Sequence, residues 1–182
     1  MKRLLIFCLV LASISLYAQE EKLGIQLHKN WLLGGNGQLY MEKIGDQTGR
    51  LIFVVEPQAG YFFSPSWLVG LRAPLRFRSN EYEIGVLPFV RFYFPVKGDI
   101  IPFLEANGGY KLRVIIDLDD EPNVKETSWV FGARGGGAFF LNDHASIDLF
   151  LFYRGESATF EGSDALLKQF FGLGAGFVVY LD

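Results

Sequence analysis

The chain has 182 residues and a formal net charge of −3; half of its residues are apolar and 16% are aromatic. With a mean hydropathy of +0.22, this composition excludes a disordered chain. The length fits one domain with a large core or a membrane-embedded surface.

The first residues predict a secretory signal peptide over 1–18. Lys2 and Arg3 form a positive start, Leu4 to Leu16 form an apolar run, and Ala18 is a small residue at a suitable cleavage point. The apolar run has about 13 residues, fewer than the ~20 that a spanning helix needs. We therefore expect a cleaved signal rather than a permanent anchor.

The mature chain, residues 19–182, contains no cysteine, because the single Cys8 lies inside the apolar run. A disulfide framework is therefore excluded. No later apolar run approaches ~20 residues, so an α-helical membrane protein is excluded as well. Without Lys2 and Arg3 the chain has 15 basic and 20 acidic residues, a net charge of −5. This acidity argues against nucleic acid as a partner.

Eight β-like segments of 12 to 16 residues follow the signal, which is enough for each to cross a bilayer, since ~9–11 tilted residues suffice. We place them at 31–43, 51–63, 67–79, 82–94, 101–116, 127–141, 145–156 and 168–181. Three connections are tight turns rich in Pro, Gly, Asn and Asp, namely 64–66, 96–99 and 142–144. The others (44–50, 80–81, 117–126 and 157–167) are mostly longer. Short turns on one side and longer loops on the other are typical of bacterial membrane barrels, and an even strand count puts both chain ends in the periplasm.

Successive side chains of a strand point to opposite faces, and in this chain the two faces differ sharply. Apart from Lys43, Ser79, Thr127 and Gln169 near the segment ends, one face of the eight segments carries no charged residue and no Asn, Gln, Ser, Thr or His. The opposite face includes thirteen charged residues that we assign to the barrel interior: Glu42, Glu56, Glu83, Glu105, Asp148, Arg72, Arg76, Arg78, Arg91, Lys111, Arg113, Arg134 and Arg154.

This sorting distinguishes two kinds of eight-stranded barrel. A soluble lipocalin-like barrel is apolar inside, whereas a membrane barrel is apolar outside and polar inside. An Arg or Lys facing lipid near the midplane costs ~2–4 kcal/mol, so thirteen charges cannot face lipid. The apolar face is too extensive to be left in water. The pattern therefore predicts an all-β fold, an eight-stranded antiparallel up-and-down transmembrane β-barrel.

Aromatic residues of the apolar face gather near both ends of the segments. On the periplasmic side these are Trp31, Tyr61, Phe63, Trp67, Phe92, Phe94, Phe139 and Phe177; on the outer side they are Phe53, Phe77, Tyr82, Trp129, Phe131, Tyr153 and Phe171. Two such girdles are expected where a barrel meets the two membrane interfaces.

Five stretches together resemble the small outer-membrane β-barrel proteins of the OmpA/OmpX-like type: NWLLGGNGQLY (30–40), EPQAGYFFSPSWLVGL (56–71), GVLPFVRFYFPVKGDIIPFLEANGGY (85–110), GARGGGAFFLNDHASIDLFLFY (132–153) and FFGLGAGFVVYL (170–181). The resemblance implies a barrel of the Gram-negative outer membrane, inserted by the outer-membrane assembly machinery. It would contact outer-membrane lipid and lipopolysaccharide, as a monomer. The family has no general catalytic residues. Its members often end on an aromatic residue, whereas this chain ends Tyr180-Leu181-Asp182.

Four prolines, Pro57, Pro74, Pro88 and Pro102, lie inside predicted strands. Because proline removes a ladder hydrogen bond, we expect them at bulges or strand ends.

The sequence offers no convincing catalytic, metal or cofactor site. A hydrolytic membrane barrel would need a histidine near its outer rim to activate a serine or water, but His28 and His144 fall at the other end. The acidic stretch 117–121 lacks the spacing and glycine of an EF-hand loop and predicts a solvated loop. GLGAG (172–176) lies in an alternating strand with no following helix, which excludes a dinucleotide loop.

The charges of the polar face predict a network inside the barrel, because buried charges must be paired. We expect it to comprise Glu56, Arg72, Arg76, Arg91, Glu105, Lys111, Arg113, Arg134, Asp148 and Arg154, with Glu56, Glu105 and Asp148 pairing with Arg72, Arg91 and Arg134. Two readings follow: a salt-bridged, solid barrel with a structural or surface-interaction role, or a narrow pore that favours anions, since bases outnumber acids eight to five. An enzyme ranks third and a soluble ligand-binding barrel fourth.

Overall fold

The computed structural model describes residues 30–42, 50–78, 81–96, 98–115, 124–160 and 166–182. The predicted signal peptide over 1–18, His28 and the acidic stretch 117–121 lie outside this part of the chain. No helix in the described ranges is both long and apolar enough to cross a membrane.

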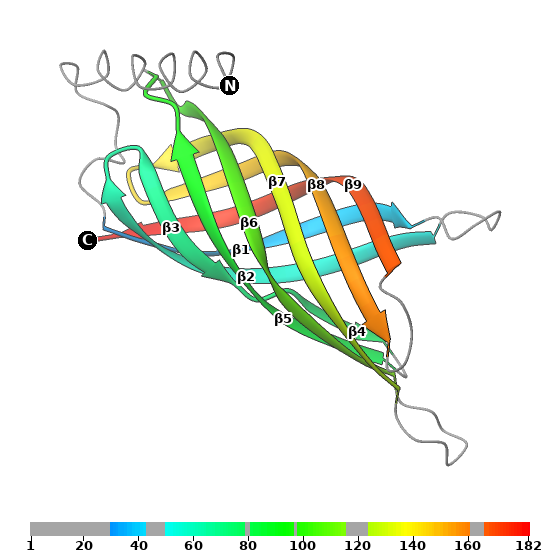
Figure 1. The fold of residues 1–182 in the computed structure, drawn as a ribbon. Helices are drawn as coiled ribbons and strands as arrows, with labels where there is room; N and C mark the ends of the chain where they lie inside the picture. Colours follow the sequence, from blue (N-terminus) through cyan, green and yellow to red (C-terminus); the bar gives the residue numbers. More distant parts are fainter. Residues whose placement is uncertain (1–29, 43–49, 79–80, 97, 116–123, 161–165) are drawn as a thin grey trace, which may run out of the picture.

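A single antiparallel sheet contains all the strands of the described ranges (Figure 1). In chain order they are β1 (Trp31–Glu42), β2 (Arg50–Ser64), β3 (Trp67–Arg72), β4 (Leu75–Arg78), β5 (Glu81–Tyr93), β6 (Ile100–Ile115), β7 (Val124–Asn142), β8 (Ala145–Phe160) and β9 (Leu166–Leu181).

Together, β3 and β4 form one strand of the barrel, because they keep the same register on both sides of a break. Arg72 of β3 pairs with Gln58 of β2, and Leu75 of β4 pairs with Val55, the position that an unbroken strand would reach. The break falls at Pro74, which has no N–H for the ladder. The barrel therefore has eight strands, as predicted, and one of them is interrupted.

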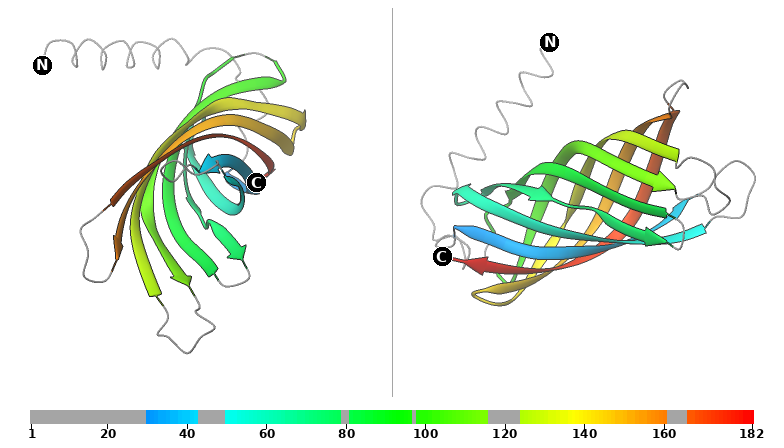
Figure 2. Two further views of the ribbon diagram at one scale, coloured as in Figure 1. Left: turned by 90° about the vertical axis from the view of Figure 1, so that its right-hand side faces the viewer. Right: turned by 90° about the horizontal axis from the view of Figure 1, so that it is seen from below.

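The sheet closes on itself at β1, which pairs with β2 on one side and with β9 on the other. Trp31 lies opposite both Tyr61 of β2 and Leu181 of β9. Figure 2 shows this closure, with β1 (blue) beside β9 (red). The predicted fold, a closed antiparallel up-and-down barrel, is confirmed.

The two ends of the barrel carry different connections. Both described ends of the chain, Asn30 and Asp182, lie at one end, which we call the terminal end, and the Asn30 amide donates to the Leu181 carbonyl at 3.0 Å. The β2–β3, β5–β6 and β7–β8 connections are at this end. Gly98, in the second of these, has a φ of +126°, a conformation that favours glycine. The opposite end is the loop end.

Burial alternates along the strands, as it must when one face of a sheet is outside and the other inside. On β8, Leu149 and Leu151 are 47% and 63% exposed, whereas Phe150 and Phe152 are each 4% exposed. The apolar face that we identified in the sequence is the outer wall of the barrel. The charged face lines the lumen.

The prolines meet the expectation only in part. Pro74 lies at the strand break. Pro102 lies one position beyond the last β5–β6 pair, Tyr93 with Phe103, so it is at the end of pairing with β5, although it still pairs with Gly137 of β7. The expectation is wrong for Pro57 and Pro88, which lie within β2 and β5 without a shift in register. The register shifts of the sheet fall instead between Phe62 and Ser64 and between Phe140 and Asn142.

The sheet accommodates these two prolines because the N–H that each one lacks would have pointed to a neighbouring strand, and the pairing with that strand is interrupted close by. The Pro57 carbonyl still accepts the Ala73 amide at 2.9 Å, next to the β3–β4 break. The pairing of β5 with β6 skips Leu87 and Pro88 and resumes in the same register. The missing hydrogen bonds are thus local, and the barrel wall continues past them.

Inward glycines make room for large inward phenylalanine rings. Gly70 lies opposite Phe89, Gly172 lies opposite Phe152, and Gly174 lies opposite Phe150. A Cβ atom added at any of these glycines would overlap the facing ring. The phenylalanine rings therefore pack against the glycine backbone, and arginines of the lumen lie over the same rings.

Candidate functional site

All ten residues that we predicted for the lumen network lie on inward positions of the barrel. The structure buries eight of them almost completely, at 4% exposure or less: Glu56, Arg72, Arg91, Glu105, Lys111, Arg134, Asp148 and Arg154. Arg76 and Arg113, nearer the loop end, keep 10% and 25% of their side chains exposed. The structure does not describe the side chains of Glu42 and Arg78.

At the centre of the lumen, two arginines and two glutamates form a closed arrangement, which we call the charge square. Arg72 lies 2.9 Å from Glu105 and 3.5 Å from Glu56. Arg134 contacts the same two carboxylates, Glu105 at 3.5 Å and Glu56 in a short ion pair. Each carboxylate thus contacts two guanidinium groups from different strands, and the square ties β2, β3, β6 and β7 together across the lumen.

Two further arginines extend the square towards β8 and β5. Arg154 donates to Glu56 at 2.5 Å and to the Gln38 side chain at 2.9 Å. Arg91 donates to Glu105 through two nitrogens, at 3.1 and 2.9 Å, and to Asp148 at 2.7 Å. The three carboxylates and three arginines that we expected to pair are therefore in one connected group, together with Arg154.

A ring of hydroxyl groups connects this group to the terminal end. Ser146 donates to Asp148 at 3.1 Å and is hydrogen-bonded to Tyr180 at 3.0 Å. Tyr180 is hydrogen-bonded to Tyr93, and Arg91 donates to the Tyr93 hydroxyl at 2.9 Å. Because Arg91 also holds Asp148, the five side chains form a closed circuit in which every charge has a polar neighbour.

Four arginines of the lumen also stack on phenylalanine rings. Their guanidinium carbons lie 4.6 Å from the ring centre in Arg72–Phe89, 4.2 Å in Arg91–Phe103, 4.8 Å in Arg134–Phe150 and 5.7 Å in Arg154–Phe152. A cation over an aromatic face is stabilised by the ring quadrupole, by more when it is shielded from water. Each of these four arginines therefore contacts at least one carboxylate and one phenylalanine ring.

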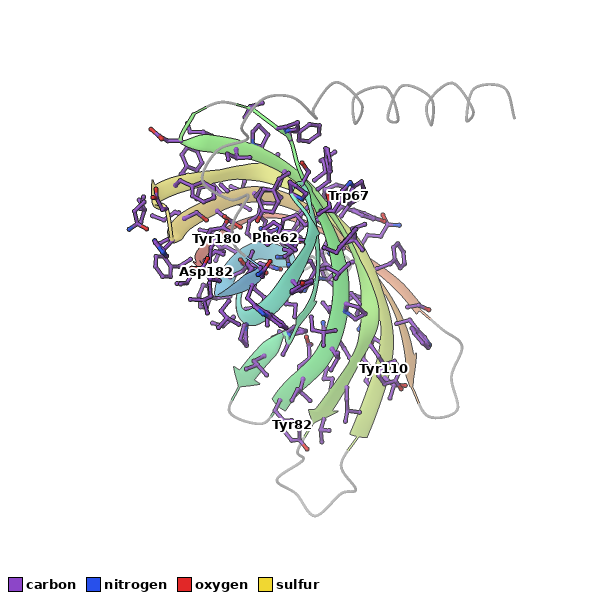
Figure 3. All side chains as sticks on the ribbon, turned by 90° about the vertical axis from the view of Figure 1, so that its left-hand side faces the viewer. Phe62, Trp67, Tyr82, Tyr110, Tyr180 and Asp182 are labelled. Carbon is purple, nitrogen blue, oxygen red and sulfur yellow. The ribbon has the colours of Figure 1, made fainter. Side chains whose placement is uncertain are left out.

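Between the hydroxyl ring and the terminal end, the lumen is filled with apolar side chains. Tyr180 packs against Phe62 at 6.2 Å and against Phe140 at 5.1 Å between ring centres, and Phe62 packs against Tyr93 at 5.7 Å. Leu32, Leu68, Ile101, Phe103, Ala138 and Val178 complete this terminal plug, each at 4% exposure or less. Figure 3 shows Phe62 and Tyr180 within this end of the barrel, with Trp67 on the outer wall.

Towards the loop end, a second group of charges lines a small polar cavity of about 20 Å³. Lys111 lies 2.5 Å from Glu83 and 2.8 Å from Glu156, and Arg76 lies 3.9 Å from Glu83. Glu126 pairs with Lys168 at 2.7 Å and with Arg113 at 3.2 Å. We call these seven residues the loop-end cluster. The cavity has room for about one water-sized species.

Sequence reasoning missed Glu126, Glu156, Lys168 and the terminal plug. Glu156 and Lys168 lie inside predicted segments, and both have the same parity as the inward residues of their strands, so the alternation of side chains between the two faces contained the signal. Glu126 is inward by parity but precedes the segment predicted to begin at 127. The sequence signal for the plug was the large apolar residues at inward positions beside the tight turns or the chain end, such as Phe62, Tyr93 and Tyr180.

The outer wall carries two rows of aromatic contacts. Near the terminal end, Trp31 packs on Tyr61 at 5.1 Å, and Trp67 packs on Phe92 at 4.9 Å. Nearer the loop end the pairs are Tyr110–Trp129 at 5.4 Å and Tyr153–Phe171 at 4.9 Å. Between the rows, Leu149, Leu151, Leu173, Phe53 and Leu39 border a shallow apolar groove of about 730 Å³.

The described residues contain no group of three or more His, Cys, Asp or Glu side chains placed to hold a metal ion. His144 lies in the exposed β7–β8 turn, where its backbone amide donates to the Asn142 side chain at 2.8 Å.

No protein-family model and no curated protein matches the sequence, but several solved structures match the fold. Neisserial surface protein A (NspA) matches with a TM-score of 0.62 and 13% identity, over 82% of this chain and 95% of that one. The N-terminal β-barrel domain of Pseudomonas aeruginosa OprF gives a TM-score of 0.59 at 14% identity, over 84% and 98%. Ail, the attachment invasion locus protein of Yersinia pestis, gives 0.50 at 15% identity, over 84% and 98%. The chain has the fold of the small eight-stranded outer-membrane β-barrels, which confirms the resemblance seen in the sequence.

Proposed function

We propose that the chain is an integral outer-membrane β-barrel of a Gram-negative bacterium, with a structural or surface-interaction role and no catalytic activity. The observation that carries the proposal is the sorting of side chains across the wall. Large apolar residues such as Phe53, Leu151 and Leu173 are 63–64% exposed outside, while the charged residues lie inside. Such a surface is stable only against lipid, since a soluble protein would expose all of it to water.

The spacing of the aromatic rows supports the same proposal. On β7, Trp129 and Phe139 are ten residues apart and both are exposed on the outer wall. At ~3.3 Å per residue and a tilt of ~35–45°, they are separated by about 25 Å along the barrel axis, the height of the apolar band in this class of barrel. The terminal end would then face the periplasm and the loop end the outside.

The filled lumen favours a solid barrel over the pore that the excess of bases had suggested. An ion crossing the barrel would have to pass the charge square and then the terminal plug, where Leu32, Tyr180 and Val178 are fully buried. Side chains commonly fill the interior of an eight-stranded barrel. The proposed role therefore lies at the outer surface and in the membrane, and the salt-bridged lumen serves to hold the wall together.

A surface role also agrees with the names of two similar structures, one described as a surface protein and the other as an attachment invasion locus protein. We further propose that the chain is exported by a signal peptide cleaved after Ala18, inserted by the outer-membrane assembly machinery, and surrounded as a monomer by outer-membrane lipid and lipopolysaccharide.

Membrane fractionation and a heat-modifiability gel test the membrane proposal. The protein should extract only with detergent, and the unboiled and boiled samples should migrate differently. Planar-bilayer recordings of the purified protein test the solid lumen, with no conductance expected. A freely soluble protein would refute the first proposal, whereas steady single-channel currents would refute only the second.

A further inference from the structure

The outer wall of the barrel is hollowed where two small residues lie side by side on neighbouring strands. Gly37 of β1 pairs with Ala175 of β9, and Ala175 pairs on its other side with Leu149 of β8. These residues line the apolar groove of about 730 Å³ that lies between the two aromatic rows. Because neither Gly37 nor Ala175 has a long side chain, the floor of the groove is close to the backbone of the sheet.

Large apolar side chains border this floor. Leu39 and Leu173, one outward position nearer the loop end, pair with each other, and Leu173 is 64% exposed. Phe177 follows Ala175 on the terminal side of β9 and is 52% exposed. From β2, the Phe53 ring leans over Gly37, since a Cβ atom added at that glycine would lie 3.1 Å from the ring. The hollow is thus enclosed by side chains from several strands.

The width of the groove suits a single hydrocarbon chain. Leu173 and Phe177 are four residues apart on β9, about 13 Å along the strand, and their own side chains take up part of this span. A helix with its side chains is ~10–12 Å wide and does not fit between them. The wall of a second barrel would rest on the borders and leave the floor empty. A carbon chain, which packs at ~3.5–4.0 Å from neighbouring carbon atoms, reaches the floor.

The chemistry of the groove points to the chain of a lipid rather than to its head group. None of the residues that line the groove is charged, and Gln38, the only one with a polar side chain, donates to Glu56 inside the lumen at 2.6 Å. A lipid recognised through its phosphates would need Arg or Lys beside the groove. The groove therefore has the features of a site for an acyl chain alone, which an ordinary phospholipid supplies.

We propose that this groove binds one acyl chain of a phospholipid. The inference rests on the proposed membrane location, because only there is the outer wall covered by lipid. Lipid chains are as apolar as the wall, so the preference for the groove comes from packing and not from the hydrophobic effect. A chain in the groove contacts both the floor and its borders, whereas a chain on the flat wall has protein on one side only.

Photo-crosslinking tests the site in vesicles of dimyristoyl phosphatidylcholine that contain a phosphatidylcholine with a diazirine near the middle of one chain. The labelling of Leu151 and Leu173, at the groove, is compared with that of Val86 and Val90, which are exposed on β5 at the opposite side of the barrel. We expect about fivefold more label at the groove, the ratio that a preference of ~1 kcal/mol gives.

The substitution Ala175→Phe fills the floor of the groove and should reduce its labelling to the level of β5. The matched control is Ala106→Phe, the same change at an exposed position of β6 outside the groove, which should label like wild type. Equal labelling of the groove and of β5 in the wild-type protein would overturn the proposal, as would a preference that persists in Ala175→Phe. The wild-type ratio is decisive on its own, even if the variant does not insert.

The intact mass of the protein released from the vesicles in mild detergent gives a second readout. The wild-type barrel and Ala106→Phe should retain one phospholipid, and Ala175→Phe should retain none. A bare wild-type barrel, a mass of two barrels, or retention of lipopolysaccharide in place of phospholipid from mixed vesicles would overturn the proposal. A wild-type protein that does not enter vesicles at all would refute the membrane location itself, whereas even labelling of an inserted barrel refutes only the chain site.

Discussion

Arg91 of β5 donates a hydrogen bond of 2.7 Å to Asp148 of β8, and this ion pair joins two strands that do not pair with each other in the sheet. Both side chains are fully buried. Asp148→Ala would leave Arg91 with Glu105 as its remaining carboxylate. Removing one partner of a buried ion pair costs roughly 3–5 kcal/mol, and we expect about 3 kcal/mol here, because Glu105 stays in place.

The loss is measured as the fall in the free energy of unfolding of the barrel in urea. Asp143→Ala, in the exposed β7–β8 turn, is the matched control and should change stability by no more than about 0.5 kcal/mol. Replacing both partners, Arg91→Met with Asp148→Leu, should recover part of the loss, since no charge is then stranded. A single variant as stable as the control would show that this ion pair does not hold the wall.

The outer wall gives a second prediction. Leu149 is 47% exposed on the outer face of β8, in the apolar groove between the two aromatic rows, so Leu149→Arg would place a charge in the lipid at a cost of ~2–4 kcal/mol. We expect a large fall in the heat-modifiable, folded fraction after refolding into vesicles. Asp143→Arg, which introduces the same side chain in an exposed turn, should refold like wild type. Normal refolding of Leu149→Arg would show that lipid does not cover this face.

The comparison of Leu149 with its neighbour shows what the sequence predicts and what it does not. Alternation correctly places Leu149 outside and Phe150 inside, and on that basis alone Phe150→Arg would be a mild change to a polar lumen. The structure shows that Phe150 is 4% exposed, lies against Gly174 and carries Arg134 at 4.8 Å. The period of a strand fixes the face of each residue, but the contacts across the lumen depend on register between distant strands, which one sequence does not reveal.

The same limit explains the other differences. Alternation along the strands predicts that Glu156 and Lys168 point inward. Their place in the loop-end cluster depends on how far β8 and β9 extend, and strand boundaries are the least predictable feature. The break at Pro74 follows from the missing proline N–H. That Pro57 and Pro88 cause no shift in register depends on which edge of the strand each N–H would have faced, which requires the pairing partners.

A third prediction concerns the contact of Gly174 with the Phe150 ring. Gly174→Val would force its side chain into that ring, and overpacking of this kind costs typically ~1–3 kcal/mol. Phe150→Ala in the same chain should relieve the clash, so the double variant should lose less stability than the sum of the two single variants. Gly135→Val on the outer wall is the control, because a Cβ there meets the flexible Leu104 side chain at 3.1 Å and the Phe103 carbonyl oxygen only at 4.0 Å. Strictly additive losses would contradict this packing.

The last prediction concerns the interrupted seam between β5 and β6. Phe94 donates to the Pro102 carbonyl at 2.9 Å, so residues of β5 an even number of positions away direct their amides to β6, and Pro88 faces Gly108. Pro88→Ala would supply the missing donor. We expect the amide created at position 88 to exchange with solvent in detergent micelles as slowly as that of Val86, and the urea midpoint to stay the same or rise, because a new hydrogen bond contributes about 0.5–1.5 kcal/mol while the loss of proline rigidity costs about 0.4–1 kcal/mol. Pro65→Ala, in the exposed β2–β3 turn, should instead create a rapidly exchanging amide. Equally rapid exchange at position 88 would mean that the pairing of β5 with β6 is interrupted there for a reason other than the proline.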